Sequence, residues 1–139
     1  MALNPSQKLK AFHSKAEMLS GPLTTNLLNF RFVLLQEEIK ELIEAFIPLY
    51  EQSRLNILDR NYLPLEEVRV LKEHLLKELC DVVYVLVGTA VQFNWDFDKA
   101  FTLVHANNMT KVKDGLKKNK SGKVLKPKGY KPVDLGGCL

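Results

Sequence analysis

The chain has 139 residues, of which 46% are hydrophobic and 26% charged, the size and composition of one globular domain. This composition excludes a disordered chain, a collagen-like repeat and a disulfide scaffold, and the net charge of +4 divides into a mildly acidic body and a basic tail. A membrane-spanning helix needs roughly 20 consecutive apolar residues, whereas the longest apolar run extends only from Val82 to Val87 and no signal peptide is visible.

Apolar residues at spacings of three and four predict two helices in the first half of the chain. The first begins at Asn4-Pro5-Ser6 and extends to about Leu19. The second is capped by Thr24 or Thr25, and Pro48 lies near its end, where the missing amide donor kinks or stops the helix. Residues 51–63 are mixed and polar, and we expect them to form a connector with some helix.

Two further helices are expected in the second half. The third begins at Pro64 and runs to about Phe93, and the fourth runs from about Phe97 to Val112 with Asp96 as its cap. The second half of the third helix is apolar almost all round, which indicates burial inside a bundle or at a subunit interface. Four helices with short connections predict an all-α four-helix bundle that assembles as a homo-dimer or tetramer.

The tail differs from the body in charge. Residues 1–110 contain 11 Lys and Arg against 14 Asp and Glu, whereas residues 111–139 contain nine Lys against two Asp. We expect a single domain over 1–139, with a helical core over 1–112 and a tail or lid over 113–139 that contacts phosphate or is simply solvated. Cys80 and Cys138 have no metal-binding spacing, which predicts free thiols in a reducing cytoplasm.

Acidic residues are the most informative feature of the second and third helices. They are Glu37, Glu38, Glu41, Glu44, Glu78 and Asp81. Residues three apart share a helix face, so two pairs of carboxylates converge if the helices are antiparallel neighbours. A solvated face explains the first four glutamates by themselves, but Asp81 lies in the most apolar stretch and needs a partner there.

That partner is either a basic residue or a metal. Arg31 is a candidate base, whereas Lys72 and Lys77 are expected to point elsewhere on a regular helix. A metal accounts for all the acids together, and oxygen ligands with no suitable His or Cys nearby favour Mg²⁺, with Mn²⁺ as a substitute. No Glu-x-x-His pair, P-loop, dinucleotide-binding loop or nucleophile elbow occurs, which excludes those classes.

The acidic motifs resemble those of a known family. Glu37-Glu38-Ile39-Lys40-Glu41 followed by Glu78-Leu79-Cys80-Asp81 resembles the EExxE…ExxD signature of MazG-like nucleoside triphosphate pyrophosphatases, an all-α superfamily that also includes dimeric dUTPases and phosphoribosyl-ATP pyrophosphohydrolases. Asn108-Met109-Thr110-Lys111 resembles the NxxK segment, and residues 121–130 are similar to the lid of short phage and bacterial members. The 36 residues between Glu41 and Glu78 exceed the usual spacing.

The resemblance implies Mg²⁺-dependent hydrolysis of a (deoxy)nucleoside triphosphate to the monophosphate and pyrophosphate. By motif position Glu38, Glu41, Glu78 and Asp81 ligate the metal. Glu37 either supports these ligands from outside or is the base that orients the water that attacks the α-phosphorus. Positive groups are also needed for the developing charge. The candidates for substrate binding are Asn108, Lys111, Lys123, Lys126, Lys128, Tyr130, Arg31 and His13.

The base is the least constrained part of this interpretation. Analogy with compact phage members favours dGTP or GTP, and a phage-encoded protein would act in the host cytoplasm. The alternative is a nucleic-acid-binding helical protein that grips the phosphate backbone with its Lys-rich tail. That alternative does not explain Glu78 and Asp81 in an apolar run, and only Tyr130 supplies the tail with an aromatic ring.

Overall fold

The computed structural model describes residues 3–18, 20–55, 58–112 and 117–139. Four α-helices follow one another, namely α1 (Pro5–Lys15), α2 (Thr25–Ser53), α3 (Leu65–Gln92) and α4 (Phe97–Met109), and the 3-10 helix η1 (Gly136–Cys138) follows them. Within the described ranges the one β-type pairing is an isolated bridge between Lys118 and Val124, so the expected all-α class is confirmed. The chain divides into two compact units, Met1–Phe93 and Asn94–Leu139.

Helix α1 begins where the sequence predicts and ends earlier. Asn4 and Gln7 form a capping box, in which the Asn4 side chain accepts from the Gln7 amide at 2.8 Å. At the other end Glu17 has a φ of 55°, and the Met18 amide donates to the His13 carbonyl at 2.9 Å. This is the pattern of a Schellman motif. The expectation of a helix to about Leu19 was therefore wrong by about one turn, and Leu19 itself lies outside the described residues.

Helix α2 is capped by Thr24 and continues through Pro48 to Ser53. Pro48 lies near the end of the helix, as predicted, but it does not stop the helix. The last turn contacts the connector that follows. The Gln52 side-chain amide donates to the Asn61 carbonyl and accepts from the Leu63 amide, both at 2.9 Å. These bonds attach the connector to the end of α2.

The third and fourth helices begin as expected. Pro64 precedes α3, and Glu66 and Glu67 lie in its first turn. The Asp96 side chain accepts from the Lys99 amide at 3.1 Å, which caps α4. Helix α4 ends at Met109 rather than at about Val112, because the Lys111 and Val112 amides form bonds of the i→i−3 type.

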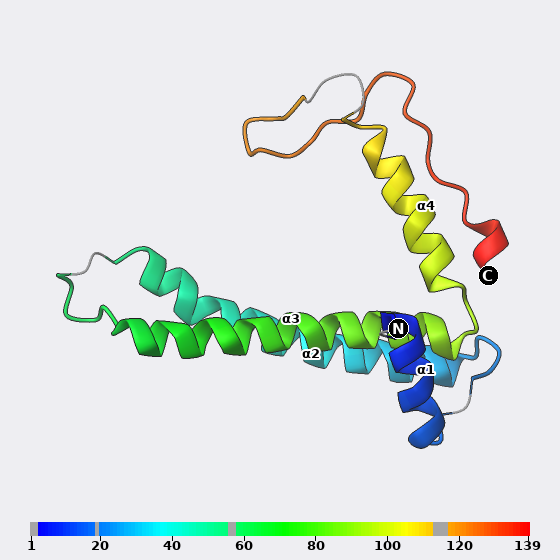
Figure 1. The fold of residues 1–139 in the computed structure, drawn as a ribbon, viewed down its shortest axis with the longest axis horizontal. Helices are drawn as coiled ribbons and strands as arrows, with labels where there is room; N and C mark the ends of the chain where they lie inside the picture. Colours follow the sequence, from blue (N-terminus) through cyan, green and yellow to red (C-terminus); the bar gives the residue numbers. More distant parts are fainter. Residues whose placement is uncertain (1–2, 19, 56–57, 113–116) are drawn as a thin grey trace. The chain divides into compact units, whose positions relative to one another are not determined.

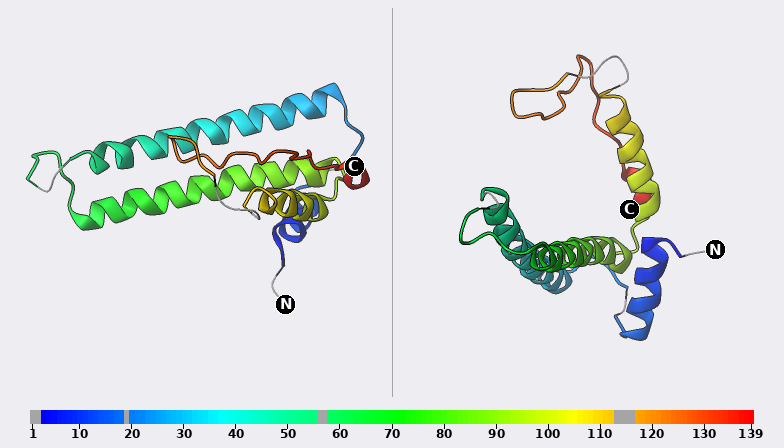
Figure 2. Two further views of the ribbon diagram at one scale, coloured as in Figure 1. Left: turned by 90° about the horizontal axis from the view of Figure 1, so that it is seen from above. Right: turned by 60° about the vertical axis from the view of Figure 1, so that its left-hand side comes forward.

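In the first unit α2 and α3 run antiparallel along one another, and α1 packs against the C-terminal end of α3 (Figures 1 and 2). The buried apolar residues lie mainly at that end and include Leu9, Val87, Ala90, Val91 and Phe93. Small residues of α3 allow α1 to approach closely there. The expectation of two antiparallel acidic helices is thus confirmed.

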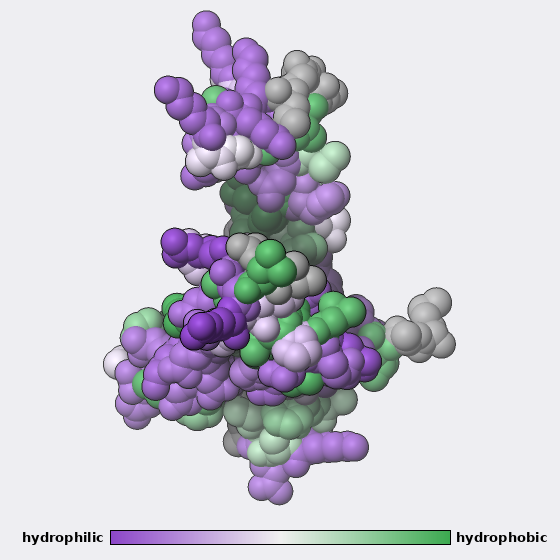
Figure 3. All heavy atoms as spheres, turned by 90° about the vertical axis from the view of Figure 1, so that its left-hand side faces the viewer, coloured by the Kyte–Doolittle hydropathy of each residue, from purple (hydrophilic) through white to green (hydrophobic). Residues whose placement is uncertain are grey.

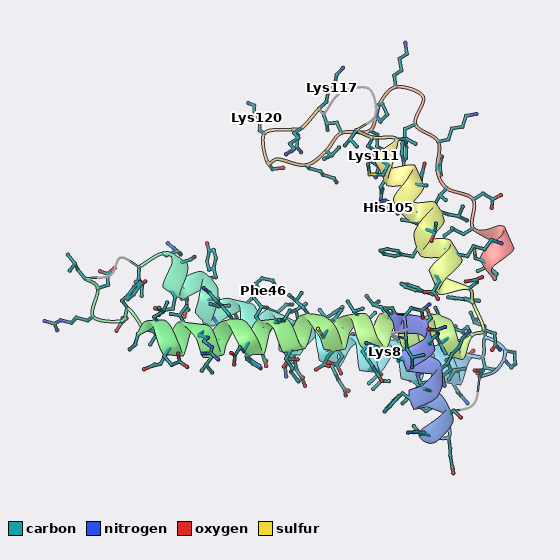
Figure 4. The ribbon with its side chains drawn as sticks, viewed as in Figure 1. Lys8, Phe46, His105, Lys111, Lys117 and Lys120 are labelled. Atoms are coloured by element: carbon teal, nitrogen blue, oxygen red, sulfur yellow. The ribbon has the colours of Figure 1, made fainter. Side chains whose placement is uncertain are left out.

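Much of the apolar surface of α2 and α3 is exposed in the single chain. Phe46 projects from α2 with 47% of its surface exposed (Figure 4), and Leu79, Val83 and Leu86 are exposed on α3. Hydrophobic side chains accordingly lie at the surface among the hydrophilic ones in Figure 3. The single chain therefore buries the end of α3 from Val87 onward and leaves much of residues 79–86 exposed. In the described part of the chain, no helix combines the length and the hydropathy needed to cross a membrane.

In the second unit the described tail folds back along α4 (Figures 1 and 2). Residues 117–125 form a turn around Asn119, whose side chain accepts from the Ser121 and Lys123 amides. The chain then returns until the Asp96 amide donates to the Cys138 carbonyl at 2.8 Å and Lys99 Nζ donates to the Gly137 carbonyl at 2.8 Å. The end of the tail is thereby attached to the start of α4.

Candidate functional site

The acids of α2 and α3 form one group in the first unit. Glu38, Glu41 and Glu78 each place a carboxylate oxygen within 4.8 Å of the others. Asp81 lies close enough to raise the pKa of Glu38 through its charge, second only to burial and ahead of Glu41 and Glu78. We refer to Glu38, Glu41, Glu78 and Asp81 as the acidic cluster. Its spacing follows from two i, i+3 pairs on antiparallel helices.

Glu78 is the most constrained member of the acidic cluster. Its side chain is 2% exposed, and its Oε2 atom has no hydrogen-bond partner among the described residues. A buried carboxylate oxygen without a partner is costly, typically by about 1–3 kcal/mol or more. The Oε1 atom accepts from Lys77 Nζ at 2.9 Å and lies 3.1 Å from His74 Nε2. The unpartnered oxygen is therefore free to bind a cation placed among the three glutamates.

The donor set fits a hard divalent cation. Carboxylate oxygens are the ligands of Mg²⁺ and Mn²⁺. Oxygens bound to one Mg²⁺ at ~2.1 Å lie at most about 4.2 Å apart, so a spread within 4.8 Å needs only small side-chain movements. The residues present can hold such an ion. Three of the four ligands expected from the sequence, Glu38, Glu41 and Glu78, lie within this spread, and Asp81 is outside it.

Two further side chains contact the acidic cluster. Lys77 was expected to point elsewhere, and His74 was not expected at the site. Lys77 Nζ lies 2.9 Å from both Glu78 Oε1 and Asp81 Oδ2, so the expectation that Lys77 points away is wrong. A lysine side chain is long enough to reach the carboxylates at i+1 and i+4 whatever the direction of its Cβ. These hydrogen bonds raise the pKa of Lys77. The i, i+4 spacing of His74 and Glu78 was a signal for the second contact.

Glu37 and Glu44 lie outside the acidic cluster. Glu37 is exposed on α2. Glu44 is exposed as well, and its carboxylate lies 3.8 Å from Lys40 Nζ at the i, i+4 spacing. An exposed pair of this kind contributes at most ~1 kcal/mol to stability. The role of Glu37 in orienting water remains a prediction.

Arg31 and His13 are buried where the three helices of the first unit meet. Arg31 of α2 donates from Nε to Thr89 Oγ1 at 3.0 Å and from Nη2 to the Val85 carbonyl at 2.7 Å. Both side chains belong to residues that are 5% exposed, which leaves little of either for a substrate. Burial first, and the charge of Arg31 second, lower the pKa of His13. The structure therefore gives Arg31 helix-packing contacts in place of the carboxylate partner that the sequence analysis considered.

The second unit contains a group of cations around one aromatic ring. Lys111 Nζ and Lys126 Nζ each lie 5.2 Å from the centroid of the Tyr130 ring. Lys111 also donates to Asn108 Oδ1 at 2.5 Å, so the two ends of the NxxK segment are in contact. We call Lys111, Lys126 and Tyr130 the cation–aromatic group. Ammonium groups within about 6 Å of a ring are attracted to its face, which fixes the tail beside α4.

Asn107 holds the tail in place, and the sequence analysis did not identify it. In the amide orientation that satisfies both ends, Nδ2 donates to the Lys131 carbonyl at 3.1 Å. Oδ1 then accepts from the Val133 amide at 3.2 Å and from the Tyr130 hydroxyl at 2.8 Å. A groove of about 440 Å³ runs along this contact and is lined by Lys126 and Tyr130 among others. No local pattern signals these partners, because they lie more than 20 residues away.

Several other lysines of the described tail have exposed side chains. Lys123 and Lys128 are exposed. Lys117 and Lys120 are exposed too and extend from the loop in Figure 4, whereas Lys111 lies at the C-terminal end of α4. The described tail thus carries several exposed positive charges besides the cation–aromatic group.

A model of the phosphoribosyl-ATP pyrophosphohydrolase family matches residues 9–108, which is most of the chain. The protein belongs to this family. Family membership supports a nucleotide pyrophosphohydrolase activity and agrees with the superfamily indicated by the acidic motifs. No curated protein matches the chain significantly.

The match to the phosphoribosyl-ATP pyrophosphohydrolase family includes the whole acidic cluster and ends at Asn108. It crosses the division between the two compact units after Phe93. Lys111, Lys126 and Tyr130 follow the matched segment. The family match therefore includes the acidic cluster, whereas the cation–aromatic group lies beyond it.

Proposed function

We propose that this family member is a MazG-like, Mg²⁺-dependent hydrolase that converts a nucleoside or deoxynucleoside triphosphate to the monophosphate and pyrophosphate. The observation that carries the proposal is the buried, unpartnered Oε2 of Glu78 inside a group of carboxylates. A family of nucleotide pyrophosphohydrolases supplies the reaction class. The crossing of the two units by the family match supports treating the chain as one functional domain, and we assign it to the cytoplasm.

The acidic cluster would hold the metal. A divalent ion bound there neutralises phosphate oxygens and supplies an activated water. Glu38, Glu41, Glu78 and Asp81 are the ligands that we propose, and Glu37 is the group that we propose to orient the attacking water. The burial of Glu78 limits competition from bulk water and strengthens electrostatic interactions at the site.

We propose that Lys111 and Lys126 bind the substrate's phosphates. Lys111, held by Asn108, and Lys126 are cations of defined position. Ammonium groups stabilise the negative charge that develops on the phosphate oxygens and on the departing pyrophosphate. Tyr130 offers an aromatic ring beside them. The exposed Lys123 and Lys128 are further phosphate contacts in this proposal.

Two classes of substrate follow from two observations. The motifs and tail resemble those of short MazG-like members, which favours dGTP or GTP. The matched family is that of phosphoribosyl-ATP pyrophosphohydrolases, and phosphoribosyl-ATP is an adenine nucleotide that carries a triphosphate. Both share the α–β phosphoanhydride bond, so the proposed chemistry is the same. We favour the free nucleotide because the Lys-rich tail beyond the match belongs to the resemblance with short members.

We also propose that the protein assembles as a homo-dimer or tetramer. Exposed apolar side chains line both long helices, including Ile43, Phe46 and Val83. So many large apolar side chains exposed on two helices of a monomer are typical of an interaction surface. Light scattering on the purified protein would detect the assembly.

The test of the activity is a panel of the eight common NTPs and dNTPs together with phosphoribosyl-ATP, with Mg²⁺ and with EDTA. We expect metal-dependent release of pyrophosphate and a nucleoside monophosphate. Release of orthophosphate and a diphosphate would place the cleavage at another bond. No turnover of any compound by the folded protein with Mg²⁺ would exclude the proposal and favour nucleic-acid binding by the tail.

A further inference from the structure

We propose that Lys77 is an internal counter-ion that occupies the acidic cluster without metal and competes with a divalent cation for Glu78 and Asp81. Its ammonium lies 2.9 Å from Glu78 Oε1 and 2.9 Å from Asp81 Oδ2. One lysine thus bridges the two acids that α3 contributes to the cluster. This proposal rests on the proposed metal site and adds a residue that regulates its affinity.

The cluster needs a positive charge whenever no metal is bound. Glu38, Glu41 and Glu78 bring carboxylate oxygens within 4.8 Å of one another, and Lys77 Nζ lies 2.9 Å from both Glu78 and Asp81. Carboxylates a few ångströms apart repel strongly when little water separates them. Lys77 relieves that repulsion in the apo protein. Removing Lys77 therefore leaves the apo cluster less stable and more available to another cation.

Lys77 and a divalent ion would compete for the same carboxylate oxygens of Glu78 and Asp81. Glu78 Oε1 already accepts from Lys77 and contacts His74, while Oε2 remains unpartnered. A divalent ion drawn to these oxygens repels an ammonium that touches the same two carboxylates. The Lys77 side chain is 60% exposed, so its ammonium can move into solvent without breaking the packing of α3. Coupling of this kind is reciprocal, so each cation weakens the other's binding by the same factor.

The experiment compares metal binding by the wild-type protein with that by three variants. Lys77→Met removes the ammonium and keeps the length of the side chain. Lys77→Arg keeps a cation at the same position. Lys72→Met removes an exposed lysine from the same helix and controls for the loss of one charge. The probe is Mn²⁺ alone, and the free ion is measured by electron paramagnetic resonance without nucleotide.

We expect Lys77→Met to bind Mn²⁺ about three- to tenfold more tightly than Lys72→Met. An effect of this size is expected because the competing ion pair is partly exposed to solvent and therefore weak. Lys77→Arg should stay within about twofold of wild type. Thermal unfolding gives a second readout, because Lys77→Met should lower the apo melting temperature and enlarge the increase produced by Mn²⁺.

Equal or weaker Mn²⁺ binding by Lys77→Met than by Lys72→Met would overturn the role of Lys77 while leaving the metal site intact. An absence of Mn²⁺ binding in wild type and every variant would overturn the metal site of the proposed function, and the role of Lys77 with it. The two failures are therefore distinguishable in one titration series.

Discussion

Gly88 of α3 leaves the space into which the guanidinium of Arg31 fits: a Cβ at Gly88 would stand 2.8 Å from Arg31 Nη2. The same Cβ would lie 3.2 Å from His13 Nε2. Arg31 cannot move aside without losing its bonds to Thr89 and to the Val85 carbonyl. A glycine at this position therefore allows α1, α2 and α3 to meet around a buried arginine.

Gly88→Ala should destabilise the protein despite the better helix propensity of alanine. Alanine gains ~1 kcal/mol over glycine within a helix, but overpacking of a buried site costs ~1–3 kcal/mol and displacement of Arg31 weakens its hydrogen bonds. We expect a net loss of about 1–2 kcal/mol in the free energy of unfolding, measured with urea at pH 7.

Gly21→Ala is the matched control for this substitution. A Cβ at Gly21 meets no atom within 4 Å, and its backbone does not require glycine. Its effect should remain within about 0.5 kcal/mol. Equal stability of Gly88→Ala and wild type would contradict the packing role of the glycine.

His13 should make the folded protein less stable in mild acid. Burial, and then Arg31, lower its pKa from 6.5 in the folded state. The unfolded chain therefore takes up a proton at a higher pH than the folded chain, and stability falls as the pH decreases through that value. His13→Gln should reduce the difference in unfolding free energy between pH 7 and pH 5.

His105→Gln is the control for the pH experiment, because His105 is exposed on α4 (Figure 4). It should retain the wild-type dependence of stability on pH. The same dependence in His13→Gln as in wild type would show that other groups, chiefly carboxylates, account for the acid sensitivity.

Asn107→Ala should loosen the tail from α4. The substitution removes the bonds to the Lys131 carbonyl and the Val133 amide, which leaves two backbone groups of the tail without their partner. We expect trypsin to cleave after the exposed Lys128, which glycine follows, several times faster than in wild type. His105→Gln, a substitution on the same helix, should be cleaved by trypsin at the wild-type rate. An unchanged rate of cleavage in Asn107→Ala would contradict the anchoring role of Asn107.

The helix starts and the acidic cluster could be predicted because their signals are local. Asp96 caps α4 through an amide three residues away, and Glu38 and Glu41 share a face by spacing alone. The converging of the acids then required only that α2 and α3 be antiparallel neighbours. A short connector between two long helices makes that arrangement the simplest one.

Other features depend on contacts that sequence spacing does not encode. Helix α2 continues past Pro48 to a last turn whose Gln52 bonds the connector, and the fold of that connector cannot be deduced from helix propensity. Lys77 reaches the acids through the length of its side chain, which an argument from Cβ directions misses. Asn107 finds its partners far along the chain in a segment without periodicity.

The central claim is that Glu78 is a metal ligand of a pyrophosphohydrolase, and Glu78→Gln tests it most directly. The variant keeps the shape of the side chain and removes its charge, and circular dichroism checks that the helices remain. Pyrophosphate release from the preferred nucleotide with Mg²⁺ is compared with that of Glu44→Gln, a glutamate outside the cluster. We predict a loss of at least about 100-fold in kcat/KM for Glu78→Gln, with Glu44→Gln within about twofold of wild type. Wild-type turnover by a folded Glu78→Gln would contradict the account.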